Sequence, residues 1–186
     1  MTVEPPQDNS PVAQVAQRLQ LLQALRLDRP DPAFDARAQT LAAQARTPGA
    51  VGIINIFNPV DGSQHFIGMA AAPGAEGLHG QLSLTRTMPG DWGYCPEVGR
   101  TRTKALVLSN VLAMPRFCHN PVVSLGVRSY AGIALITYTG LVLGTACFIG
   151  TAERDEDVHY PWLSIIKDVA AQTMAPINQK LRQLHL

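Results

Sequence analysis

Two long apolar segments in the C-terminal half constrain the fold more than any other feature of the sequence. They run from Ser129 to Thr137 and from Leu141 to Gly150, and only the turn Tyr138-Thr139-Gly140 separates them. Two such segments joined by so short a turn are typical of an antiparallel β-hairpin. The sequence therefore predicts a fold built around an antiparallel sheet.

Both ends of the chain have helical periodicity instead. Apolar residues recur every three or four positions from Val12 to Leu25, which predicts a helix over 11–27, and similar spacing predicts helices over 31–46 and 161–184. Pro176 lies inside the last of these, where we expect it to kink the helix or to leave one backbone carbonyl unpaired. Helices at both ends of an antiparallel sheet indicate an α+β layer architecture.

The middle of the chain supplies the remaining strands. Shorter segments of strand type are predicted at 51–57, 65–69, 81–87 and 105–108, and a short helix at 92–101. Two prolines limit 110–126 to turns and short helix, for which Asn110 and Asn120 are candidate caps. We expect a disordered tail at 1–10 and one domain over 11–186, with N-terminal helices at 11–46, a sheet and its lid at 51–150, and a C-terminal helix at 161–184.

Composition excludes several classes of function. The chain has 186 residues, 46% of them hydrophobic, and a formal net charge of +1, which gives no support for a nucleic-acid or membrane partner. No apolar segment is long enough to span a bilayer, and the polar, Pro-rich start does not resemble a signal peptide, so we expect a cytoplasmic protein with free thiols at Cys95, Cys118 and Cys147. The histidines are scattered, so no metal site is predicted, and no phosphate-binding glycine loop is present.

Four motifs occur together in the second half of the chain: GYCPEV from Gly93, VLSNVLAMPRFCHNPVV from Val107, VRSYAGIAL from Val127 and GLVLGTACFI from Gly140. In this order and spacing they resemble the GAF domain, a small-molecule-binding module of many bacterial signalling proteins. The segment PDPAFD, Pro30 to Asp35, also resembles the usual lead-in to this family. The resemblance covers residues 15–180. It implies an antiparallel sheet of five or six strands, with the terminal helices on one face and a pocket closed by short helices and loops on the other.

The resemblance also implies where a ligand would bind. The pocket is expected between the sheet and a lid over 92–126, with Arg128 bracing the lid and His119 as the most interesting polar candidate. No cofactor can be named from the sequence. The expected wall of the pocket consists of Trp92, Tyr94, Cys95, Phe117, Cys118, His119, Asn120, Val123 and Tyr130.

Three functions are compatible with this resemblance. The first is a sensory or regulatory module that binds a small apolar or amphipathic molecule, forms a homodimer through its terminal helices and acts on a partner protein. The second is a free methionine-R-sulfoxide reductase with Cys118 as nucleophile and Cys95 as resolving thiol, although Arg128 and the apolar stretch 146–149 stand where that family holds the substrate amine with carboxylates. The third is a bilin photoreceptor attached at Cys118 beside His119. We favour the first, which is not an enzyme.

Overall fold

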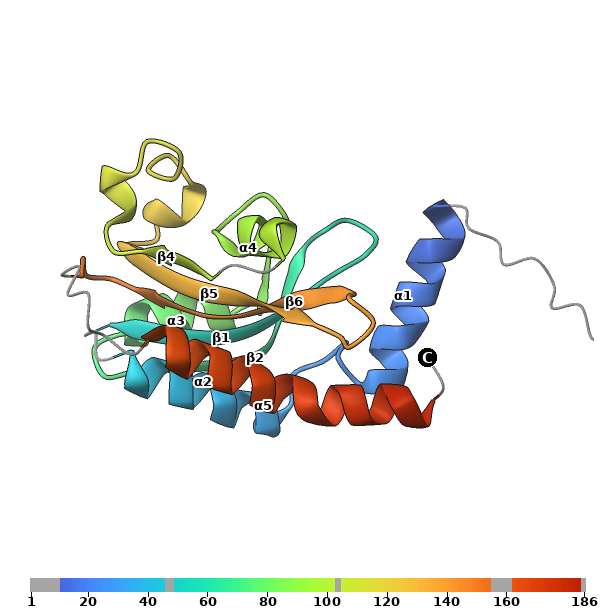
Figure 1. The fold of residues 1–186 in the computed structure, drawn as a ribbon. Coiled ribbons are helices and arrows are strands. Elements are labelled where there is room, and N and C mark those ends of the chain that lie inside the picture. Colours follow the sequence, from blue (N-terminus) through green and yellow to red (C-terminus); the bar gives the residue numbers. More distant parts are fainter. Residues whose placement is uncertain (1–10, 46–48, 103–104, 155–161, 185–186) are drawn as a thin grey trace, which may run out of the picture.

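The protein is built on one antiparallel sheet of six strands, ordered β3-β2-β1-β6-β5-β4 (Figure 1). The computed structural model describes residues 11–45, 49–102, 105–154 and 162–184; the tail expected at 1–10 lies outside them. The predicted long hairpin is confirmed as the pair β5–β6. The strands are β1 (Ala50–Phe57), β2 (Gln64–Ala71), β3 (Thr87–Met88), β4 (Leu106–Leu108), β5 (Ser129–Ile136) and β6 (Val142–Gly150).

The two central strands come from distant parts of the chain. Strand β1 pairs with β6, so that Ile53 lies opposite Cys147 and Asn55 opposite Thr145. A register shift in β1 between Ile54 and Asn55 interrupts its pairing with β2. Both strands are buried along nearly their whole length, because helices cover one face of the sheet and the lid covers the other.

Helices α2 (Pro32–Gln44) and α5 (Trp162–Gln183) pack side by side on one face of the sheet (Figure 1). A Cβ atom at Gly52 would lie 2.0 Å from the carbonyl oxygen of Ala38, and one at Gly68 would lie 2.4 Å from that of Phe34. Since no real side chain tolerates such distances, these two glycines let the backbone of α2 rest directly on β1 and β2.

Helix α1 (Pro11–Leu25) stands at the end of the sheet, beside the C-terminal end of α5 (Figure 1). Its apolar stripe divides into two parts. Leu22 and Leu25 are buried in the core, whereas Val12 is 79% exposed. The Lys180 ammonium of α5 donates to the carbonyl of Ala24 and fixes the base of α1. The expectation that the terminal helices cover one face is therefore confirmed for α2 and α5, while α1 extends beyond the sheet.

The opposite face carries the short elements α3 (Glu76–Ser83), α4 (Cys95–Thr101), η1 (Val111–Ala113) and η2 (Pro121–Val123). Asn110 and Asn120 cap η1 and η2 through their side-chain oxygens, as predicted. The Arg128 guanidinium donates to the carbonyls of Val123 (3.1 Å) and Val127 (2.9 Å), which confirms that it braces the lid.

One prediction from local pattern was wrong. The stretch 81–87 was predicted to be a strand, but its first residues complete α3, and the strand is reduced to β3. Leu78 and Leu82 of α3 are buried one helical turn apart, while Leu84 is 85% exposed. Helix α5 continues through Pro176 without a break, and because proline has no amide proton it leaves one backbone carbonyl of the helix unpaired, which is one of the two outcomes expected there. Pro176 is exposed, so water can satisfy the carbonyl that lacks an amide partner. Within the described part of the chain, no helix has the length and apolar character needed to cross a membrane.

Candidate functional site

The space between sheet and lid, where the resemblance places a ligand, is filled by aromatic side chains. Tyr94 packs edge-on against Tyr130 with ring centroids 5.3 Å apart, and against Phe117 at 5.6 Å. Both tyrosines are 1% exposed. The cavity that remains measures about 20 Å³, which is room for about one water molecule.

The residues expected to form the wall of this pocket divide into three groups. Tyr94, Cys95 and Tyr130 line the small cavity. Trp92, Phe117 and Val123 are half-buried and pack against the same apolar cluster. Asn120 is structural, since its side chain bonds Gly93 at both the amide (2.8 Å) and the carbonyl (2.9 Å). Cys118 and His119 do not line the cavity: the Cys118 thiol donates to the carbonyl of Pro115 at 3.5 Å, and His119 is exposed.

A buried polar network lies beside the tyrosines. The backbone and hydroxyl of Thr145 both donate to Asn55 Oδ1, at 2.8 and 2.9 Å. The Asn55 amide donates to Gln64 Oε1 at 3.0 Å, and the Gln64 amide donates to the carbonyls of Trp92 (2.6 Å) and Pro89 (3.1 Å). This chain of bonds ties the two central strands to the segment that precedes α4.

Two of the three thiols meet next to this network. Cys95 Sγ lies 3.6 Å from Cys147 Sγ, and the Tyr130 hydroxyl donates to Cys95 Sγ at 3.5 Å. The hydrogen bond from Cys147 lowers the pKa of Cys95 below its ordinary value, and the same bond together with burial raises the pKa of Cys147. The pairing of Cys95 with Cys118 that the reductase would use is not formed. Across the described ranges, no cluster of three or more His, Cys, Asp or Glu side chains could hold a metal ion.

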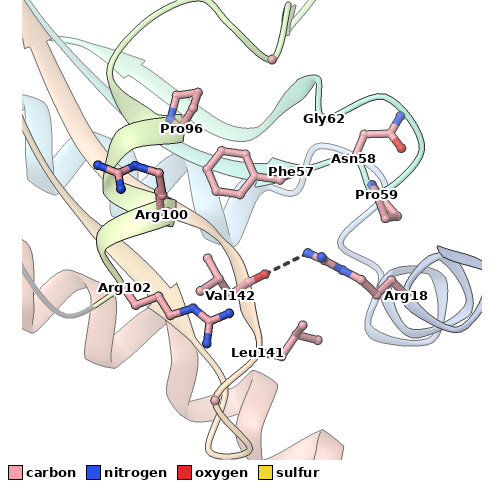
Figure 2. Close-up of a pocket in the computed structure, with 13 residues that line it drawn as sticks. Arg18, Phe57, Asn58, Pro59, Gly62, Pro96, Arg100, Arg102, Leu141 and Val142 are labelled. Atoms are coloured by element: carbon pink, nitrogen blue, oxygen red, sulfur yellow. Dashed lines mark hydrogen bonds between the residues drawn. The ribbon is translucent and has the colours of Figure 1, made fainter. Parts of the chain in front are cut away.

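A much larger pocket opens at the end of the sheet next to α1, with a volume of about 590 Å³ (Figure 2). Five separate parts of the chain form it: α1, the β1–β2 connection, Gly90, α4 with the residues after it, and the β5–β6 turn. We call it the arginine pocket. It is lined by Arg18, Phe57, Asn58, Pro59, Gly62, Gly90, Pro96, Gly99, Arg100, Arg102, Gly140, Leu141 and Val142.

Arginines approach this pocket from two sides. Arg18 reaches in from α1 and donates to the carbonyl of Val142 at 3.0 Å, while Arg100 and Arg102 come from α4 and its C-terminal end (Figure 2). Arg18 is half-buried, and burial lowers its pKa. Arg100 is held by Glu97, whose carboxylate it meets at 2.7 Å.

The floor between the arginines is apolar. The Phe57 ring lies there, and a Cβ atom at Gly99 would come within 2.7 Å of it, so the glycine lets α4 pack closely on this ring. No carboxylate is among the lining residues, and in the described part of the chain neither Arg18 nor Arg102 has an ion-pair partner. The pocket thus combines a flat apolar floor with uncompensated positive charge.

Sequence reasoning did not find this pocket. Its residues come from distant segments and form no local motif. One signal was available: Arg18 lies on the apolar stripe of α1, three residues after Val15 and four before Leu22. A cation on the side of a helix that faces the protein needs either a partner or a ligand.

Comparison with known proteins gives the fold its context. No family model matches the sequence, and no curated protein matches it. Solved structures do match. The GAF domain of an Acinetobacter phosphoenolpyruvate-protein phosphotransferase is 14% identical with a TM-score of 0.57, covering 92% of this chain and 94% of that domain. A GAF domain of Synechocystis in its photoproduct state is 17% identical with a TM-score of 0.58, over 82% of this chain and 96% of the other.

An enzyme is also among the similar structures. The type II free methionine-R-sulfoxide reductase of Thermoplasma acidophilum is 13% identical with a TM-score of 0.55, and the match covers 84% of this chain and 96% of the reductase. Regulatory domains, photoreceptors and an enzyme therefore share this architecture, and the fold alone does not choose between them. The six-stranded antiparallel sheet, the helices on one face and the lid on the other give this chain the fold of a GAF domain.

Proposed function

We propose that the protein is a regulatory GAF domain that binds a small anionic molecule in the arginine pocket. One observation carries the proposal: Arg18 and Arg102, which have no ion-pair partner among the described residues, line a pocket of about 590 Å³ whose lining contains no carboxylate. A guanidinium presents a fork of donors that matches carboxylate and phosphate groups. A negative ligand would supply the charge that the protein leaves uncompensated.

The volume and lining of the pocket indicate which class of ligand it could bind. Its volume lies within the range of small-molecule sites, roughly 300–1,000 Å³. Phe57, Leu141 and Val142 offer an apolar surface beside Arg18 and Arg102. We therefore propose a ligand with a flat apolar part and a carboxylate or phosphate group.

The position of the pocket next to α1 suggests how ligand binding could change the orientation of that helix. Arg18 belongs to α1, whose base is fixed to α5 through Lys180, while Val12 at its other end is exposed. A ligand that draws Arg18 away from the carbonyl of Val142 would reorient α1. We propose that this helix presents the signal, either to a second copy of the chain in a homodimer or to a partner protein.

The two other functions have less support. A cavity of about 20 Å³ beside Cys95 has no room for methionine sulfoxide, and Cys118 bonds a backbone carbonyl on the lid. Attachment of a bilin at Cys118 would need space that Tyr94 and Tyr130 occupy.

The test measures thermal stabilisation by simple probes. Phenyl phosphate and benzoate represent the proposed class, with benzylamine as the cationic and benzamide as the neutral analogue. We expect the anions to raise the melting temperature of the wild type and of Arg29→Gln, an exposed control, but not that of Arg18→Gln. Equal stabilisation of Arg18→Gln, or no preference for the anions over benzylamine and benzamide, would contradict the proposal.

A further inference from the structure

The thiols of Cys95 and Cys147 form a buried pair, and neither residue lines the arginine pocket. Cys95 is the first residue of α4, and Cys147 lies in the middle of β6. Both side chains are buried, and their sulfur atoms are 3.6 Å apart. In the sequence the two residues are 52 positions apart, so the fold alone brings them together.

We propose that this pair is a redox modification site, at which a small hydroperoxide converts the two thiols into a disulfide that fixes α4 on the sheet. A disulfide needs its sulfurs about 2.05 Å apart, so they must approach by about 1.5 Å. Cys147 is held by pairing to Ile53 on one side and to Gly132 on the other. The movement therefore falls to α4.

The chemistry balances with the hydroperoxide as the only co-reactant. Cys95 loses its thiol proton and attacks the terminal oxygen of the hydroperoxide; the O–O bond breaks, and the proton leaves with the alcohol, or with water in the case of hydrogen peroxide. Cys95 is then a sulfenic acid. The Cys147 sulfur attacks it, the S–O bond breaks, and the hydroxyl leaves as water with the Cys147 proton. Two thiols lose two electrons, and the hydroperoxide gains them.

The surroundings favour Cys95 as the first thiol to react. It accepts hydrogen bonds from the Tyr130 hydroxyl and from Cys147, and both bonds stabilise its thiolate. The cavity of about 20 Å³ that both cysteines line admits a molecule close to water in size. Among hydroperoxides, hydrogen peroxide comes nearest to this size, and a bulky disulfide such as oxidised glutathione is excluded.

The disulfide would also act on the arginine pocket, because α4 supplies Pro96, Gly99 and Arg100 to it. This consequence rests on the proposed function, whereas formation of the disulfide does not. Disulfide formation and ligand binding are measured by separate experiments, so either can fail without the other.

The experiment uses the full chain, reduced and then treated with hydrogen peroxide. Remaining thiols are alkylated with N-ethylmaleimide in denaturant and counted by mass spectrometry. We expect the oxidised wild type to lose two hydrogens and to take up one label, at Cys118, instead of three. Cys118→Ala should still form the disulfide, whereas Cys95→Ala and Cys147→Ser should not. Circular dichroism of the reduced variants confirms that they fold.

Hydrogen exchange gives a second readout on α4. We expect the backbone amide protons of Glu97–Thr101 to exchange at least about tenfold more slowly in the oxidised wild type than in the reduced wild type. In Cys147→Ser, treatment with hydrogen peroxide should leave these exchange rates unchanged. Three labels after oxidation, or a disulfide that contains Cys118, would overturn the proposed site. A Cys95–Cys147 disulfide without slower exchange in α4 would overturn the effect on the helix. Phenyl phosphate binding in the two redox states then tests the link to the pocket alone.

Discussion

Replacing Tyr94 with phenylalanine should stabilise the protein, although it removes a polar atom from the core. The Tyr94 hydroxyl is buried and makes no hydrogen bond with the described residues, and burial raises its pKa to about 12. A buried polar group without a partner costs about 1–3 kcal/mol of folding free energy. Since the ring keeps its edge-on contacts with Phe117 and Tyr130, Tyr94→Phe should gain about 1–2 kcal/mol.

Tyr130 provides the matched control. It is buried to the same extent and lies 5.3 Å from the Tyr94 ring, but its hydroxyl donates to Cys95 Sγ. Tyr130→Phe should therefore lose about 0.5–1 kcal/mol. Urea unfolding followed by circular dichroism measures both changes. In thermal unfolding, each kcal/mol corresponds to roughly 2–4 °C for a chain of this size.

The opposite signs are the essential part of this prediction. If Tyr94→Phe lowers the stability as much as Tyr130→Phe does, the Tyr94 hydroxyl has a hydrogen-bond partner in solution. The small cavity between sheet and lid would then hold a bound molecule, and the reasoning that this space is filled would be refuted.

Two further predictions concern pH and assembly. Burial raises the pKa of Tyr94 to about 12 and that of Tyr130 well above the ordinary value of about 10, so the free energy of unfolding keeps its full value below about pH 10 and falls as the pH rises above it; the urea midpoint should fall with it, and less steeply in Tyr94→Phe. If the exposed end of α1 joins two copies of the chain, Val12→Asp should weaken the dimer at least about tenfold in sedimentation equilibrium, while Val60→Asp, on the exposed β1–β2 connection, should not. Equal sedimentation of both variants and the wild type would contradict a role for α1.

Much of the fold could be predicted because its pattern is local. The hairpin β5–β6, the three long helices and the capping roles of Asn110 and Asn120 follow from neighbouring residues, whereas the role of Arg128 was implied by the resemblance to GAF domains. Helix α3 was missed because Gly77 and Gly80 lower its helical propensity, while the alternation around Leu82 and Leu84 resembles a strand. In the folded protein Leu82 is buried and Leu84 is exposed, whereas a strand would place both side chains on the same face.

The candidate site was predicted less well, because it depends on how much space the packed side chains leave and on contacts between residues far apart in the sequence. The sequence placed Tyr94 and Tyr130 beside a pocket, but only packing shows that their rings fill it. Packing of α4 on β6 brings Cys95 to Cys147, and the arginines of the open pocket come from α1 and from α4 with its C-terminal end. No spacing along the chain encodes those contacts.

The pairing of β1 with β6 also determines when this protein can fold during its synthesis. Asn55 and Thr145 are 90 positions apart, so at about 5–20 residues per second the ribosome needs about 5–20 s to supply the partner of a β1 strand already made. Until β6 has been made, the edge of β1 that will pair with it has no strand partner. Asn55 discourages a wrong partner there, because only Thr145 satisfies its side-chain oxygen through both backbone and hydroxyl. The Asn55 side-chain oxygen thus favours the correct register of β1 against β6 once β6 has been made.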